Sequence, residues 1–156
     1  MRSRQKTKKV PSLKVIPIGG LNEIGKNMTL LEYQNEILII DCGLSFPDDE
    51  MYGIDIVIPD FTYLIANREK IVGMVLTHGH EDHIGAIPYL LKNIKIPIYG
   101  TRLTLGLVEN KLKEHNVIGD LKTITAGDRI TLGHFDIETI RTTHSIADSI
   151  CLAINT

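Results

Sequence analysis

Hydrophobic and polar residues form short runs in the first quarter of the chain, and these runs predict strands. Aliphatic residues dominate the segments 13–18, 28–33 and 36–41, and turn-forming residues separate them. The second and third runs are joined at "QNE", whose last residue already begins the third run, which favours a tight hairpin there. We therefore expect the chain to begin with a meander or a hairpin.

The pattern changes in the next part of the chain. Residues 42–60 mix glycine, proline and acids without a period, which predicts an irregular loop, and long loops in compact domains tend to be functional. A short helix is expected at 61–67. The apolar run "IVGMVLT" at 71–77 has polar residues on both sides and predicts a strand buried on both faces.

The second half predicts helices and strands in alternation. A helix is expected after His83, a strand at 96–100 and an amphipathic helix at 101–115. From Lys122 the pattern indicates hairpin-linked strands, the last of which begins at Ser149. The sequence thus predicts one α/β domain, with a mixed sheet and flanking helices.

Composition and charge agree with a globular protein. The 156 residues are 43% hydrophobic and 23% charged, and no apolar run is long enough to span a bilayer. Because a secretory signal is also lacking, we expect a cytoplasmic location and no membrane partner. Cys42 and Cys151 lie in apolar runs and are predicted to be reduced core thiols.

Basic charge is concentrated at the start of the chain. Residues 1–9 hold five of the seventeen lysines and arginines and none of the nineteen acids, so removing this +5 from the net −2 leaves −7. We expect a disordered basic tail at 1–10 and a single domain at 11–156.

The segment "THGHEDH" is the strongest candidate for chemistry. Side chains two apart in an extended segment face the same way, so His78 and His80 can bind one ion at about 2 Å. Asp82 and His83 follow where the chain bends and can face a second point nearby. Two divalent ions about 3.5–4 Å apart can activate a shared water and offset charge on a phosphate, so two metals are favoured.

Two residues outside this segment have suitable placement. His144 ends a predicted strand and is the best third ligand, whereas His115 and His134 are expected to be surface or capping residues. Asp41 ends another predicted strand, where a buried acid is costly unless it has a partner such as the free N–H of a ligand histidine. The alternative for Asp41 is a loop cap beside Gly43.

The segment "THGHEDH", together with Asp41 and His144, resembles the signature of the metallo-β-lactamase superfamily. Four stretches also resemble the bacterial ribonuclease J family of its β-CASP group: "GGLNEIGKN", "IDCGLSFPDDEMYGIDIVIPDFTYL", "LTHGHEDHIGAIPYLL" and "RTTHSIADS". The resemblance implies the first part of an αβ/βα sandwich, before the β-CASP insertion. It also implies 5′-to-3′ exonuclease and endonuclease activity on RNA, in RNA processing and decay.

The resemblance further implies roles for individual residues. One ion would lie on three histidines, His78, His80 and His144. Asp82 and His83 would hold part of a second ion and serve in catalysis, with Asp41 orienting the histidines from behind. Zinc suits imidazole ligands, and manganese is an alternative for the carboxylate site. Because the family places further ligands beyond Thr156, we expect this chain alone to be weakly active or inactive.

Other functions are compatible with the same motif. The chain could belong to another metallo-β-lactamase-like hydrolase that cleaves a small thioester or lactam, or to a non-catalytic subunit of an RNA-degrading complex. The intact "HGHEDH" argues against a non-catalytic role. For the full-length protein, the expected partners are RNA as substrate and either a second copy of itself or an RNA-degradation complex.

Overall fold

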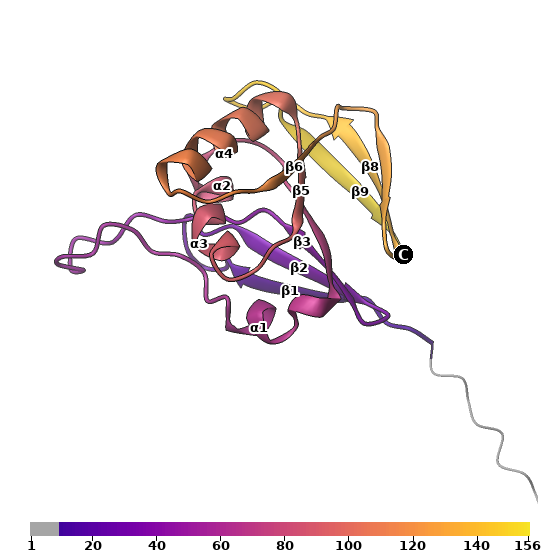
Figure 1. The fold of residues 1–156 in the computed structure, drawn as a ribbon, viewed down its shortest axis with the longest axis horizontal. Helices are drawn as coiled ribbons and strands as arrows, with labels where there is room; N and C mark the ends of the chain where they lie inside the picture. Colours follow the sequence, from indigo (N-terminus) through magenta and orange to yellow (C-terminus); the bar gives the residue numbers. More distant parts are fainter. Residues whose placement is uncertain (1–9) are drawn as a thin grey trace, which may run out of the picture.

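The computed structural model describes residues 10–156, so all but the last residue of the predicted basic tail lies outside the described residues. A six-stranded sheet lies between helices on one side and a three-stranded sheet on the other (Figure 1). The strands of the larger sheet are, in spatial order, β1 (Lys14–Gly19), β2 (Met28–Tyr33), β3 (Glu36–Ile40), β4 (Ile71–Val75), β5 (Pro97–Gly100) and β6 (Asp120–Thr123). The smaller sheet contains β7 (Arg129–Leu132), β8 (Phe135–Arg141) and β9 (Ile150–Asn155).

Strand direction divides the larger sheet into two halves. Strands β1, β2 and β3 are antiparallel, which confirms the predicted meander, and Gln34 and Asn35 turn the β2–β3 hairpin with φ values of 46° and 70°. Strands β3 to β6 are parallel and therefore need crossover connections. The helices in these connections are α1 (Thr62–Ala66), the 3₁₀ turn Arg68–Lys70, α2 (Glu81–Ile84), α3 (Ile87–Leu91) and α4 (Arg102–Glu114).

Alternating side chains on the central strands build two cores. Ile39 and Met74 pack toward the helices, whereas their neighbours Leu38 and Val75 pack toward the smaller sheet, and all four are fully buried. Burial of each such side chain contributes about 1.5–3 kcal/mol. Strand β4 is thus buried on both faces, as the unbroken apolar run at 71–77 predicted.

A helix follows His83 as predicted, since α3 begins at Ile87, but a further short helix, α2, begins before it at Glu81. The chain therefore forms two short helices instead of one. The cause is a loop inserted between them: the Cys42 N–H donates to the His83 carbonyl at 2.7 Å, and the Cys42 carbonyl accepts from the Ala86 N–H at 2.9 Å. Helix α2 therefore gives its carbonyls to a distant loop rather than to a continuing helix.

The two cysteines have different surroundings. Cys42 is fully buried as predicted, but Cys151 is exposed, so the prediction of a second core thiol was wrong. On β9, Leu152 and Ile154 pack against the inter-sheet core, and alternation turns Cys151 to the opposite face, where it pairs with the half-exposed Ile140 of β8.

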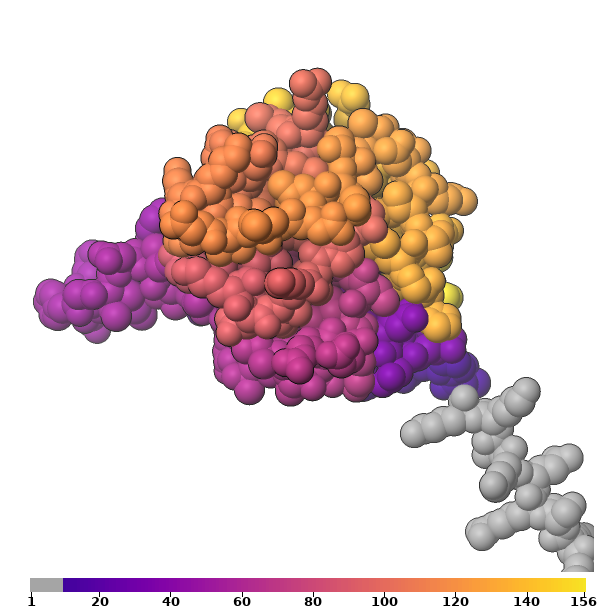
Figure 2. Space-filling model, in the orientation of Figure 1, coloured from indigo at the N-terminus to yellow at the C-terminus, as the bar shows by residue number. Residues whose placement is uncertain are grey.

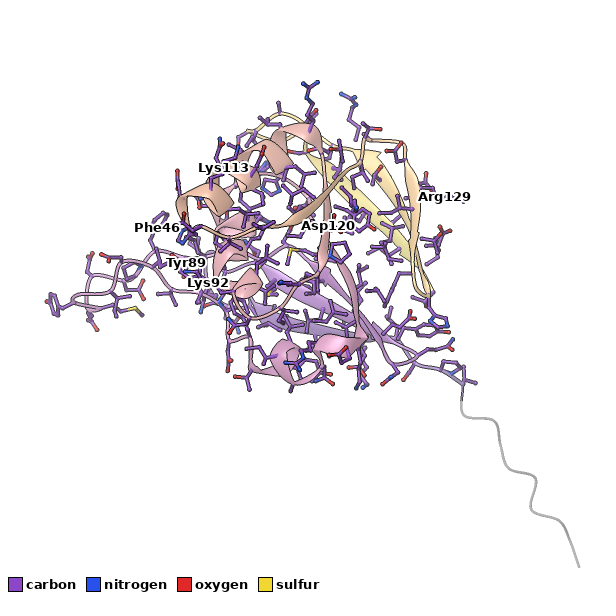
Figure 3. The ribbon with its side chains drawn as sticks, in the orientation of Figure 1. Phe46, Tyr89, Lys92, Lys113, Asp120 and Arg129 are labelled. Carbon is purple, nitrogen blue, oxygen red and sulfur yellow. The ribbon has the colours of Figure 1, made fainter. Side chains whose placement is uncertain are left out.

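The predicted loop at 42–60 is irregular apart from one bridge between Ser45 and Val57. It protrudes from the body of the molecule (Figure 2), and Phe46 and Tyr52 are largely exposed on it. Asp120 begins β6, the last strand of the larger sheet, and Arg129 begins β7, the first strand of the smaller one (Figure 3). None of the helices in residues 10–156 has the length and hydrophobicity needed to cross a bilayer.

Candidate metal centre

Three of the predicted ligand histidines meet beyond the ends of two strands. His78 and His80 follow β4, and His144 lies in the loop between β8 and β9. One ligand atom from each histidine lies within 4.8 Å of the others. The ring centroids of His78 and His144 are 4.5 Å apart. The fold therefore brings together residues from both sheets that are distant in the sequence.

One ring nitrogen of His78 has the surroundings expected of a metal ligand. Its Nε2 atom is buried and has no hydrogen-bond partner, whereas buried polar atoms normally have one. Burial, followed by the charge of His83, lowers the pKa of His78 to about 4. The ring is therefore neutral near pH 7, and a divalent ion shared with the other two histidines would satisfy Nε2.

A short relay from Asp41 fixes which nitrogen of His78 carries the proton. The Thr77 hydroxyl donates to Asp41 Oδ2 at 2.7 Å, because a carboxylate can only accept. Its oxygen then accepts from Nδ1 of His78 at 3.0 Å. With the proton on Nδ1, the lone pair of Nε2 is free to bind a cation.

Asp41 also contacts His83 directly. Nδ1 of His83 donates to Asp41 Oδ2 at 2.7 Å, so its Nε2 carries a lone pair when the ring is neutral. Burial lowers the pKa of His83, but the hydrogen bond to Asp41 and the charges of Asp41 and Asp82 outweigh it, so the pKa is raised overall. The structure thus places Asp41 behind two of the predicted ligands rather than as a loop cap.

Asp82 and His83 form a second pair beside the trio. Both lie in α2, and Oδ2 of Asp82 is 3.5 Å from Nε2 of His83. Two ligand atoms that each bind an ion at about 2.0–2.2 Å lie about this far apart. The pair therefore fits one ion, with two donor atoms where the trio offers three.

A close approach of two backbones holds this pair in place. Gly43 packs so tightly that an added Cβ would lie 1.6 Å from the carbonyl oxygen of Asp82. The Asn27 N–H donates to that oxygen at 3.0 Å, and the Gly43 N–H donates to the Asn27 carbonyl at 3.0 Å. Only glycine fits at position 43, two residues after the left-handed Asp41, whose φ is 59°.

The remaining histidines lie elsewhere, as predicted. Nδ1 of His134 contacts Glu36 Oε2 at 2.8 Å on the surface. His115 caps the end of α4 and packs its ring 5.0 Å from that of Tyr89, which lies beside Lys92 in Figure 3.

Sequence reasoning missed two residues at the centre. Thr77 ends the predicted strand, and its place just before His78 was a usable signal for a role beside the ligands. Asn27 contacts Asp82 across 55 residues, so no local pattern could have indicated it.

Comparison with known proteins places this chain beside metal-dependent hydrolases by sequence similarity. Residues 21–155 match the metallo-beta-lactamase superfamily. The chain is 54% identical to ribonuclease J of Synechocystis sp. over 155 residues, covering 97% of this chain and 24% of that protein. It is 48% identical to ribonuclease J of Helicobacter pylori strain 26695 over 148 residues, covering 93% and 22%. The chain thus spans about a quarter of the length of these curated relatives.

A solved structure supports the fold. The metallo-beta-lactamase fold protein YhfI from Bacillus subtilis superimposes with a TM-score of 0.56 at 21% identity, covering 94% of this chain and 57% of that one. At this identity the likeness concerns the fold alone. Since the superfamily match covers most of the chain and both sheets follow the same fold, the chain belongs to the metallo-β-lactamase superfamily.

Proposed function

We propose that this chain forms the metal-binding part of a ribonuclease that hydrolyses RNA phosphodiesters, as a 5′-to-3′ exonuclease with endonuclease activity. The similarity to ribonuclease J along most of the chain supports RNA as the substrate. The observation that carries the proposal is the meeting of His78, His80 and His144 around a buried nitrogen without a partner.

Two divalent ions fit the side chains present. His78, His80 and His144 would hold one, and Asp82 and His83 would supply part of the site for the other. The ions would supply an activated water and positive charge that offsets the phosphate oxygens. Imidazole ligands favour Zn²⁺ at the trio, and the carboxylate makes Mn²⁺ an alternative at the pair.

The surrounding side chains prepare these ligands. Asp41 holds the Nδ1 protons of His83 directly and of His78 through Thr77, so both Nε2 lone pairs stay available. Hydrogen bonds of this kind fix the ring orientation of metal-binding histidines. We further propose that the whole protein acts in the cytoplasm, as a homo-oligomer or within an RNA-degradation complex.

The test uses 5′-monophosphorylated RNA labelled at its 5′ end and a protein that extends this chain to the length of its relatives. Release of mononucleotides from the 5′ end is expected, together with some internal cleavage, and chelation by EDTA should abolish both. Replacing His78 or His144 by alanine should lower cleavage at least about 100-fold, because each removes a direct ligand of the ion.

His134→Ala is the matched control, since His134 is a surface histidine away from the trio. It should leave the cleavage rate unchanged. Hydrolysis of a small thioester or lactam without cleavage of RNA would contradict the proposal. Full RNA cleavage by the His144→Ala protein would contradict it as well.

A further inference from the structure

The side-chain amide of Asn27 contacts both ligands of the second pair. Its Nδ2 atom lies 3.0 Å from Asp82 Oδ2, 3.1 Å from the Asp82 carbonyl oxygen and 3.3 Å from Nε2 of His83. The two oxygens of Asp82 can only accept, so the nitrogen end of the amide must face them. The orientation of Asn27 follows from its partners.

These contacts join the two donor atoms proposed for the second ion. Asp82 Oδ2 and His83 Nε2 lie 3.5 Å apart, and Asn27 touches both. The side chain of Asp82 is nearly half exposed, so little else restrains its carboxylate. An N–H donor therefore selects the carboxylate orientation that places Oδ2 beside His83.

We propose that Asn27 is a positioning residue for the second cation, acting through Asp82. The inference rests on the proposed function because it assumes that Asp82 and His83 bind an ion. His83 Nε2 has a single lone pair, so the amide must release it when an ion takes that lone pair, while its bond to Asp82 Oδ2 can remain. The amide thus holds the ligand pair together before the ion arrives and restrains the carboxylate afterwards.

The packing of the loop does not depend on this amide. The backbone N–H of Asn27 donates to the Asp82 carbonyl, its own carbonyl accepts from Gly43, and the neighbouring Lys26 N–H donates to the Leu44 carbonyl at 2.9 Å. These main-chain bonds anchor the segment without the side chain. A change of the amide should therefore alter ion binding more than folding.

The experiment is a Zn²⁺ titration, against a competing chelator, of the protein extended to the length of its relatives, so that both binding steps can be followed. Asn27→Leu keeps the size of the side chain and removes its donor, and Asn27→Ala serves as a second variant in case leucine disturbs packing. The second step should weaken about 10- to 100-fold, as for loss of a hydrogen bond to a ligating carboxylate. The first step and the melting temperature of the metal-free chain should not change.

Asn93→Leu is the matched control, because the exposed Asn93 side chain donates to the Tyr89 carbonyl at 3.1 Å and bonds to none of the proposed ligands. An unchanged or tighter second step in both Asn27 variants would overturn the inference, and so would equal weakening of both steps. An extended parent protein that binds one ion only would also overturn it, yet leave the trio intact. Failure of the proposed function would appear differently, as loss of the first step or absence of RNA cleavage.

Discussion

Nδ1 of His83 donates a 2.7 Å hydrogen bond to Oδ2 of Asp41, a buried carboxylate 42 residues earlier in the chain. The same oxygen accepts from the Thr77 hydroxyl, which in turn accepts from His78. One acid at the end of β3 therefore sets the proton positions of a histidine in the trio and a histidine in the pair. This arrangement couples the two candidate ion sites to a single side chain.

Asp41→Asn should weaken Zn²⁺ binding at both sites by about 10- to 100-fold, because it turns one of the two accepting oxygens into an NH₂ donor that faces other donors, and because the amide carries no charge. A competition titration with a chromogenic chelator measures both steps. The control is Asp48→Asn, an exposed acid in the protruding loop, which should bind Zn²⁺ like the parent. Parent-like affinity at both steps in Asp41→Asn would show that neither histidine needs the carboxylate.

The lowered pKa of His78 predicts how the stability of the metal-free chain depends on pH. His78 has a pKa of about 4 when folded and about 6.5 when unfolded, so the unfolded state binds more protons between these values. The contribution of His78 to stability is therefore present above pH 6.5 and is lost as pH falls toward 4. Each unit of pKa difference corresponds to about 1.4 kcal/mol, an upper bound for this partly accessible ring.

Urea denaturation of the metal-free chain at pH 7 and pH 5 measures this loss. His78→Gln removes the titrating ring but keeps a polar side chain of similar length, so the decrease in unfolding free energy on acidification should shrink. His134→Gln, with its ring on the surface, should lose as much stability as the parent. If His78→Gln loses as much as the parent, His78 does not titrate as described.

The sequence predicted the strands of the site better than its helix. Long apolar runs determine strands such as β4, because both faces of the strand are buried whatever surrounds it. The separate helix α2 was not predicted, because Glu81 and its neighbours bond to the loop at Cys42, and such pairing leaves no trace in a local pattern. The exposure of Cys151 could not be predicted either, because it depends on which face of β9 packs against the core.

The candidate site was predictable where ligands share one segment. His78 and His80 stand two apart and were paired by spacing alone, whereas His144 was chosen as the third ligand from its place at the end of a predicted strand. Asn27 and Thr77 were not predicted, because their roles depend on contacts with a carboxylate from another segment. Hydrogen bonds that orient ligands come from any element that packs nearby, so their spacing in sequence is not fixed.

The two thiols should react at different rates. Cys42 is fully buried and burial raises the pKa of its thiol, while Cys151 is exposed on β9. A disulfide reagent such as DTNB should modify one thiol per folded chain quickly and both in urea. The Cys151→Ser chain should show almost no fast reaction, and Cys42→Ser should keep it. Fast modification of Cys42 in the folded chain would mean that its loop opens readily.

Two glycines offer a matched test of the close approach behind Asp82. In Gly43→Ala the new Cβ would lie 1.6 Å from the Asp82 carbonyl oxygen, and backbone on both sides cannot yield without moving α2. We expect a loss of more than about 3 kcal/mol in unfolding free energy, since overpacking against backbone is among the costliest substitutions. Any folded fraction should bind the second ion poorly.

Gly106→Ala is the counterpart, because Gly106 lies inside α4 and its added Cβ would meet no atom within 4 Å. Alanine there should raise the unfolding free energy by about 1 kcal/mol through helix propensity. Urea denaturation of both variants gives opposite signs if the Cys42–Gly43 loop packs on α2 as described. Equal stability of Gly43→Ala and the parent would mean that the loop and α2 are separated in solution, and the positions of Asp82 and His83 would then need another explanation.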